Sequence, residues 1–326
     1  MAGKVITVNG LITKRTLLVA GVIVAGALLV VASYLLEPMP FPRYLRLPVG
    51  DWIEAAVDWL TVSWAVFFDG ISFVVGKVLT WITDRFLGLP WPVVILLFAL
   101  VGWKTAGRRV AIFGIAGLLF LGILNLWQEG MYTLALIVTA VILSLVLGIP
   151  LGILASRSDR FESIIKPILD AMQTMPSFIY LIPAILFFGI GRVPGVLATV
   201  IFSLPPVVRL TNLGIREVSL EVVEAATSFG STSRQLLTKV RLPLALPTIM
   251  AGVNQTIMMA LSMVVVASMI GAPGLGYNIL YGIMRVDLSI GVESGIGILI
   301  LAMILDRITQ GIGKTRRRAL TMEYMG

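Results

Sequence analysis

The residue pattern with the clearest spacing in this chain is suited to docking a partner rather than to catalysis. Glu224, Ala225 and Ala226 are followed after three residues by Gly230, and nine residues later by Val240-Arg241-Leu242-Pro243. Two alanines in succession leave a small, smooth surface that a partner can approach closely. No nucleophile–base pair or set of metal ligands accompanies the carboxylate. The pattern is therefore compatible with a surface that a partner approaches, and an ordinary amphipathic cytoplasmic loop is the alternative.

The same stretch predicts a short helix, a turn and a second helix. Good helix formers run from Glu221 to Phe229, and Gly230 can adopt a positive φ and end the helix. We expect Ser231 or Ser233 to cap the helix that follows. Pro243 is expected to mark a boundary before the next apolar run.

A second set of candidate residues lies inside apolar runs, where polar groups are costly and commonly functional. We expect Gln173, Thr174 and Ser177 to share one helical face, and Asn254, Met258 and Ser262 to share another. Aromatic rings and methionine side chains suit a quaternary ammonium group. Hydrogen bonding between packed helices is the alternative for each residue. The candidates for a transport path are Gln173, Thr174, Ser177, Tyr180, Asn254, Met258, Ser262 and Met263.

Composition places these residues in a membrane protein. The 326 residues are 58% hydrophobic and 13% charged, with a mean hydropathy of +1.00, whereas a soluble domain carries about a quarter charged residues. There is no Cys and no His, which excludes disulfides and removes the commonest general base and metal ligand. The net charge of +8 is attributed to cytoplasmic helix ends rather than to nucleic-acid binding.

Apolar runs predict about eight membrane spans, of which the second and sixth are short. With a cytoplasmic amino terminus, the outer segments hold few basic residues and both termini are cytoplasmic. The first run is interpreted as an uncleaved anchor, with a cleaved signal peptide as the alternative. The predicted spans are Leu17–Leu36, Trp91–Lys104, Val110–Trp127, Thr133–Ala155, Ile168–Ile190, Pro194–Val208, Leu246–Ile270 and Gly295–Ile312.

The segment 37–90 differs from these runs, because polar residues recur in it every three or four positions. Asp51, Glu54, Asp58 and Asp69 belong to this narrow polar stripe, and several tryptophans lie between its members. That pattern favours one or two amphipathic helices in the outer membrane interface. A further true span is the alternative, which the carboxylates disfavour.

The spacing around Glu224 resembles the signature loop of binding-protein-dependent ABC importer permeases, with Val240 where isoleucine is commoner. The runs 169–178, 247–256, 260–270 and 274–276 resemble the glycine betaine/proline branch of that family. Together the similarity covers about residues 91–310. The resemblance assigns docking of an ATPase to Glu221, Glu224, Ala225, Ala226, Gly230, Leu242 and Pro243.

The resemblance implies an all-α integral membrane protein with the transmembrane fold of a type I ABC importer. The expected organisation is an anchor at 1–36, interfacial helices at 37–90, a permease domain at 91–312 with its cytoplasmic coupling loop at 209–243, and a basic cytoplasmic tail at 313–326. The implied location is the bacterial cytoplasmic (inner) membrane.

The resemblance also implies partners. It predicts a second copy of this chain, two ATP-binding cassette ATPases, a periplasmic or tethered substrate-binding protein, and a solute such as glycine betaine, proline betaine or choline. ATP and Mg²⁺ would bind the ATPases, and this chain would hold no cofactor and no catalytic residue. Gly311-Ile312-Gly313-Lys314-Thr315 resembles the end of a Walker A loop, but Ile308 stands where its first glycine is required.

Two other classes compete with this interpretation. An ion-coupled secondary transporter would be expected to show related halves or carboxylates at span centres. An intramembrane enzyme would need a Ser–Lys or paired-Asp site. Neither pattern is evident in the sequence, and neither class explains the spacing around Glu224. The secondary transporter remains the leading alternative.

Overall fold

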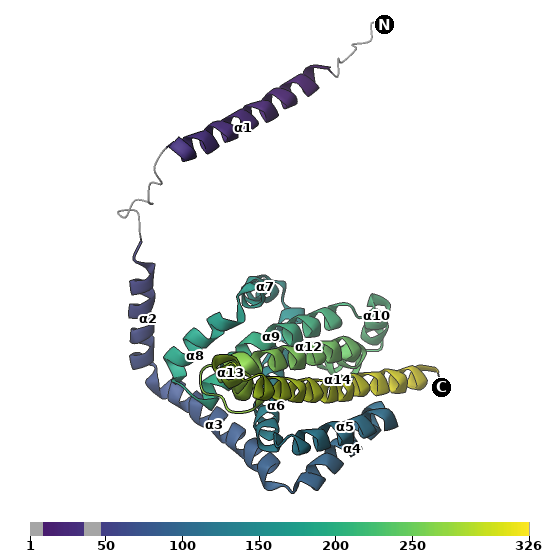
Figure 1. Cartoon of the computed structure of the whole chain (residues 1–326). Coiled ribbons are helices and arrows are strands. Elements are labelled where there is room, and N and C mark those ends of the chain that lie inside the picture. Colours follow the sequence, from purple (N-terminus) through teal and green to yellow (C-terminus); the bar gives the residue numbers. More distant parts are fainter. Residues whose placement is uncertain (1–8, 36–46, 326) are drawn as a thin grey trace. The chain divides into compact units, whose positions relative to one another are not determined.

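The computed structural model describes residues 9–35 and 47–325, and the side chains of 16–33 and 47–313. All regular structure in these residues is helical. The chain divides into two parts, 1–56 and 57–326, that are described separately. The first contains α1 (Asn9–Leu35) and the beginning of α2 (Val49–Ser63) (Figure 1). The exposed apolar side chains of α1 are those expected of an isolated membrane anchor.

The second part begins with the end of α2 and continues through a series of apolar helices. Glycines with positive φ separate several of them, including Gly107 between the fourth and fifth helices. The elements are α3 (Ala65–Gly88), α4 (Trp91–Ala106), α5 (Arg108–Ile123), α6 (Trp127–Arg157), α7 (Asp159–Thr174), η2 (Ser177–Tyr180), α8 (Leu181–Phe188), α9 (Arg192–Arg216), α10 (Leu220–Ser228), α11 (Ser233–Gln235), η3 (Leu236–Arg241), α12 (Leu242–Ser268), α13 (Leu275–Arg285) and α14 (Leu288–Met325).

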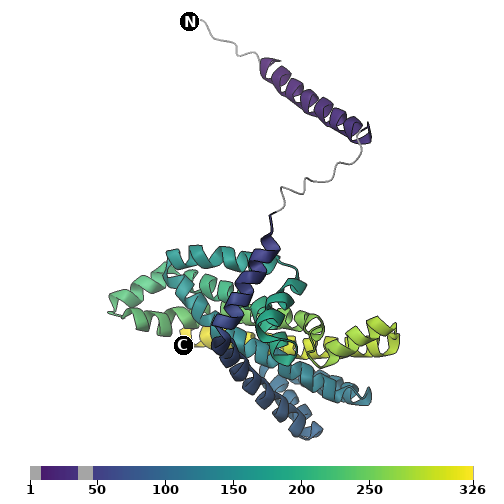
Figure 2. The same ribbon diagram turned by 90° about the vertical axis from the view of Figure 1, so that its left-hand side faces the viewer.

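The centre of the second part is formed by α6, α9 and α12, with α9 packed against both neighbours (Figures 1 and 2). Small residues permit this close approach. A Cβ added to Gly152 would lie 2.5 Å from the Cβ of Thr211, and one added to Gly148 would lie 2.4 Å from a methyl of Val207. The two glycines are four residues apart on one face of α6, the small-residue spacing common between membrane helices.

Within residues 9–35 and 47–325, six helices are long and apolar enough to cross a membrane, and one bent pair could form a seventh span. Five predicted spans coincide with helices of this kind or overlap them, but Trp91–Lys104 and Val110–Trp127 correspond to α4 and α5, which have 16 residues each and are not among the six. The predicted span Val110–Trp127 also crosses the break between α5, which ends at Ile123, and α6, which begins at Trp127.

The predicted sixth span is longer than expected, because α9 continues past Val208 to Arg216. Its interior prolines, Pro205 and Pro206, are buried and do not end it.

The predicted continuous span Ile168–Ile190 is wrong. Helix α7 ends at Thr174, and the two helical segments on either side of Met175 and Pro176 meet at an angle of 113°. Met175 is extended, with φ −69° and ψ 137°, because the ring of a following proline disfavours the helical conformation. The α-helix therefore ends one residue before Met175.

Helix α3 lies within the segment 37–90, which the sequence predicts to lie in the membrane interface. It is long and apolar enough to span, and it packs on α6 and α9 through Val75, Leu79 and Ile82. Phe73 and Trp81 on its other face are exposed. A side packed against other helices and an exposed apolar side favour the spanning alternative. Lys77 at its midpoint favours the interface, so the position of 37–90 in the membrane stays a prediction.

Candidate functional site

Local hydrogen bonds close the end of α10. Gly230 has φ +78°, its N–H donates to Thr227 O at 2.9 Å, and the N–H of Ser231 donates to Ala226 O at 3.1 Å. These two bonds form a Schellman motif, which satisfies carbonyls that a helix end leaves free. The predicted role of Gly230 as the helix stop is confirmed.

The cap of the next helix is Thr232, not Ser231 or Ser233 as predicted. Its Oγ1 accepts from Gln235 N–H at 3.3 Å, and Gln235 Oε1 accepts from Thr232 N–H at 2.9 Å. This reciprocal pair is a capping box. Ser231, whose backbone N–H completes the preceding Schellman motif, lies one residue before the cap, and Ser233 is the first residue of the helix.

The expected boundary at Pro243 is also wrong. Residues from Ser233 to Ser268 form one continuous helical segment. The turn before the proline is a π-helix, η3, in which Leu242 N–H donates to Leu237 O rather than to the carbonyl of Thr238. A wider turn gives the proline ring room beside the preceding carbonyls, so the helix continues through it.

The exposed surface of α10 and of its C-cap residue, Phe229, combines large apolar side chains with acidic ones. Leu220 is 72% exposed and Phe229 is 91% exposed, while Glu221 and Glu224 are also exposed. Such a patch on an end of the molecule is typical of a protein docking surface. Phe229 was absent from the predicted docking set, although a large aromatic residue before a helix-ending glycine could have pointed to it.

The predicted docking residues do not all lie on this surface. Ala225 and Gly230 are exposed, and Ala226 is half-buried. Leu242 packs against a small core cluster that includes Ile215 and Ile249, and Pro243 is half-buried. Leu242 and Pro243 therefore lie at the end of the coupling loop that packs against the core, and they do not form part of its exposed surface. In Figure 1 α10 lies at the same end of the second part as the α4–α5 turn.

The structure separates the candidate path residues around the bend. Gln173 and Thr174 end α7, whereas Ser177 begins η2, so the three do not share one helical face. Tyr180 is 2% exposed, and its hydroxyl donates to the backbone carbonyl of Met172. Because this bond connects the two sides of the bend, Tyr180 braces the bend instead of lining an open surface.

The candidates on α12 divide between surface and core. Asn254, Met258 and Ser262 share a face as predicted, because α12 is one regular helix. Met258 and Ser262 are exposed, and the Oδ1 of half-buried Asn254 has no hydrogen-bond partner among the described residues. Met263 is 0% exposed and belongs to a core cluster with Tyr180. Together with Gln255, which is also exposed, Met258 and Ser262 form an accessible stripe along α12.

A groove of about 430 Å³ between α7 and α9 brings one residue of this stripe close to the bend. Gln173 from α7, Arg209 from α9 and Gln255 from α12 all line it. The sequence singled out Gln173 but not Arg209 or Gln255. Among the described residues no group of three or more His, Cys, Asp or Glu side chains could hold a metal ion.

Comparisons with known proteins agree with this arrangement. Residues 148–318 match the family of binding-protein-dependent transport system inner membrane components. Over 278 residues, 85% of this chain and 78% of the relative, the sequence is 48% identical to the glycine betaine/proline betaine transport system permease protein ProW of Escherichia coli (strain K12). It is 47% identical to the glycine betaine transport system permease protein OpuAB of Bacillus subtilis (strain 168), covering 83% of this chain and 96% of that one.

A third relative is the glycine betaine/carnitine transport permease protein GbuB of Listeria monocytogenes serotype 1/2a (strain 10403S), at 50% identity over 84% of this chain and 98% of that one. Among solved structures, a chain of the inward-facing MetNI methionine ABC transporter gives a TM-score of 0.51 at 22% identity, covering 60% of this chain and 95% of that chain. This likeness concerns the fold.

Proposed function

Because the chain belongs to the family of binding-protein-dependent transport system inner membrane components, we propose that it is the permease subunit of an ATP-driven importer for glycine betaine or a related quaternary ammonium solute. The observation that carries the proposal is α10, which combines the full signature spacing with an exposed apolar and acidic surface. The relatives that match most of the chain are permeases for glycine betaine, proline betaine or carnitine.

The proposed partners follow from this assignment. Two ATP-binding cassette ATPases dock on α10 of two copies of this chain, since each chain provides one such helix. ATP and Mg²⁺ bind the ATPases. A periplasmic or tethered binding protein delivers the solute on the opposite side. Closure of the ATPases draws the two α10 helices together and opens the path outward.

The proposed path runs along the accessible stripe of α12 beside the bend that follows α7. Exposed Met258 offers a polarizable wall, and Phe178 at the bend is 55% exposed and offers an aromatic face. These groups suit a quaternary ammonium ion, which cannot donate hydrogen bonds. Gln173, Thr174, Ser177 and Ser262 provide hydrogen-bonding groups for the carboxylate of a zwitterion.

The proposed orientation places both termini and α10 in the cytoplasm. Lys104 and Arg108 at the α4–α5 turn and Lys239 near α10 supply the basic residues that favour the inner side. The ion-coupled secondary transporter is set aside, because the matching relatives are permeases of binding-protein-dependent systems.

The test is affinity purification of the tagged chain in mild detergent, followed by uptake in proteoliposomes. We expect an ATPase with a complete Walker A loop at equal stoichiometry, and uptake of radiolabelled glycine betaine that requires ATP and the binding protein. A preparation that lacks any ATPase even after crosslinking would overturn the proposal. Competition by choline, carnitine and proline betaine would then define the solute.

A further inference from the structure

Helix α7 is attached to the rest of the molecule differently from its neighbours. Leu169 is its only fully buried residue in the described structure. Ile164 and Ile168 are 64% and 53% exposed. Apolar packing therefore contributes little to holding α7 in place, and the contacts that fix it are polar.

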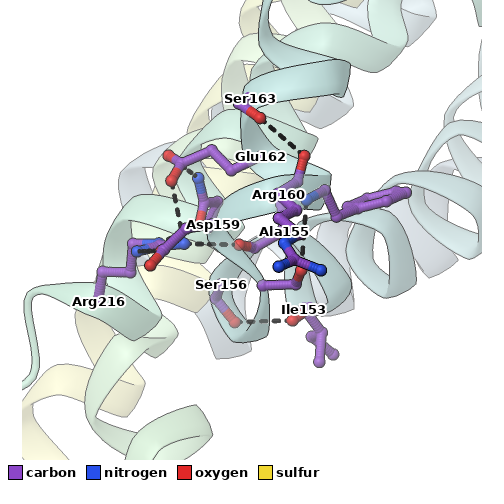
Figure 3. A network of polar contacts seen from close by, with 11 residues as sticks. Ile153, Ala155, Ser156, Asp159, Arg160, Glu162, Ser163 and Arg216 are labelled. Atoms are coloured by element: carbon purple, nitrogen blue, oxygen red, sulfur yellow. Dashed lines mark hydrogen bonds and ion pairs between the residues drawn. The ribbon is translucent and has the colours of Figure 1, made fainter.

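The largest of these contacts is a network around Arg216 (Figure 3). Its Nη1 lies 2.7 Å from Asp159 Oδ1 and its Nη2 lies 2.9 Å from Glu162 Oε2, both on α7. Nη2 also donates to the carbonyl of Ala155 on α6 at 2.8 Å, and Nε donates to Asn212 Oδ1 at 3.0 Å. One guanidinium thus joins α6, α7 and α9, using the planar fork that lysine lacks.

Asn212 completes the network. While its Oδ1 accepts from Arg216, its Nδ2 donates to Glu162 Oε1 at 2.8 Å. Glu162 and Arg216 are each about one-third exposed at the side chain, whereas Asp159 is 89% exposed. Charge-assisted bonds strengthen as water is excluded, so the contacts of Glu162 dominate and that of Asp159 is weak.

Arg216 stands where α9 leads into the docking segment. It is the last residue of α9, and α10 begins four residues later at Leu220. Glu217 N–H donates to Leu213 O at 2.9 Å, so the chain stays helical almost to that junction. Only residues 217–219 separate the two helices, so Arg216 is the residue of α9 nearest to α10 along the chain.

Near its other end α7 is held by a second polar contact, and a groove lies beside the helix. The Arg216 network and this contact are called the first and second tethers of α7. Asp170 pairs with Arg209 of α9, and the groove of about 430 Å³ lies beneath α7 between the two tethers. A helix held by ion pairs over open volume can change position without breaking a packed core. Beyond Asp170, α7 leads directly into the bend at Met175 and Pro176.

From this geometry we propose that Arg216 is a positioning residue, which transmits movement of α10 to α7 and through it to the bend beside the transport path. This inference rests on the proposed function and assigns a route for its coupling. None of its polar partners is a candidate path residue, although Arg216 lines the same groove as Gln173 and Gln255. Those partners are Ala155, Asp159, Glu162 and Asn212. When the network around Arg216 is lost, the ATPases hydrolyse ATP with less solute transported.

The experiment compares Arg216→Gln with Arg157→Gln in the reconstituted transporter. Arg157, the last residue of α6, is an exposed cation beside the network that takes no part in its contacts. The measurement is glycine betaine taken up per ATP hydrolysed with saturating binding protein. We expect R216Q to lower this ratio by about tenfold, as for loss of a typical coupling energy, with ATPase retained on purification. R157Q keeps the wild-type ratio.

Two further results keep the inference testable if R216Q is poorly folded. Glu162→Gln removes the charge from the main pair while Arg216 can still donate to Ala155 O, and thermal unfolding reports whether the fold is retained. A retained fold with a lowered transport ratio supports the inference. A retained fold with the wild-type ratio, or an unchanged ratio in R216Q, overturns it. Absence of ATP-dependent uptake in the wild-type complex overturns the proposed function instead.

Discussion

Helices α10 and α7 both belong to the regions flanking α9, yet opposite kinds of interaction define them. Helix α10 is delimited by local backbone bonds at Gly230 and Thr232, and its outer face has no cover within the described chain. Helix α7 is fixed by side chains from distant sequence positions, with Arg216 and Arg209 on α9 as its partners.

The difference teaches which parts of such a molecule can be recognised from spacing alone. A helix whose ends are set by neighbouring residues keeps its shape when its partner leaves. A helix set by remote ion pairs takes the position that those pairs allow. In the proposed transporter the first kind forms a docking surface and the second kind forms a movable connection.

The largest expected effect is at the end of α10. Gly230→Val forces a β-branched residue into a left-handed conformation, which costs about 1–2 kcal/mol or more. A Cβ there meets no atom within 4 Å, so the cost is in the backbone. We expect at least about tenfold less ATPase recovered with the tagged chain. Gly230→Asn is the control, since asparagine tolerates this conformation; equal loss in both variants would contradict the explanation.

The second-largest effect is expected from a charge reversal on the exposed surface of α10. Glu224→Lys should leave the chain in the membrane but remove ATPase from the purified complex or uncouple it, because a rim carboxylate is replaced by a cation. Glu217→Lys, an exposed reversal before α10, is the matched control. Normal uptake by E224K with ATPase bound would show that the docking assignment is wrong.

A smaller effect is predicted for a substitution at Thr232, which caps the helix that follows Gly230. Thr232→Ala removes one side of the capping box and should cost about 1 kcal/mol of local helix stability. Amide hydrogen exchange of residues 233–238 should accelerate about fivefold, with uptake reduced less than in G230V. Thr232→Ser keeps the hydroxyl and should exchange like the wild type. Unchanged protection in T232A would contradict the capping assignment.

The smallest effect is expected at the second tether of α7, which is the ion pair between Asp170 and Arg209. Asp170 and Arg209 are 51% and 38% exposed at their side chains, and such pairs contribute about 0–1 kcal/mol. Asp170→Asn should lower uptake less than twofold at physiological salt and leave ATPase binding unchanged. A loss as large as that of R216Q would place the main connection at Arg209 and reverse the ranking of the two tethers.

Much of the outline of the fold was predictable from composition and apolar runs. The spans that became α6, α12 and the described part of α14 agree with their helices because twenty apolar residues in succession leave few other structures in a membrane. Gly230 was predictable for a similar local reason. The predicted cap was one residue away from the observed one, since the helix begins at Ser233 and Thr232 precedes it.

Prolines show where prediction from sequence stops. Pro176 ends α7, while Pro206 and Pro243 lie within continuous helices. All three carry the same ring and lack the same N–H. What differs is the surroundings, because neighbouring helices and a π turn can accommodate the ring in one place and not in another. The bend, and the separation of Ser177 from Gln173, follow from this.

The sequence by itself determined that this chain is a helical membrane protein with a short helix around Glu224, because composition and short-range spacing are local properties. Only the tertiary structure decided which polar residues meet. Tyr180 and Met263 became core because distant helices cover them. Arg216 became the junction of three helices because Ala155 and Glu162 approach it from α6 and α7, while Asn212 lies one turn away on its own helix.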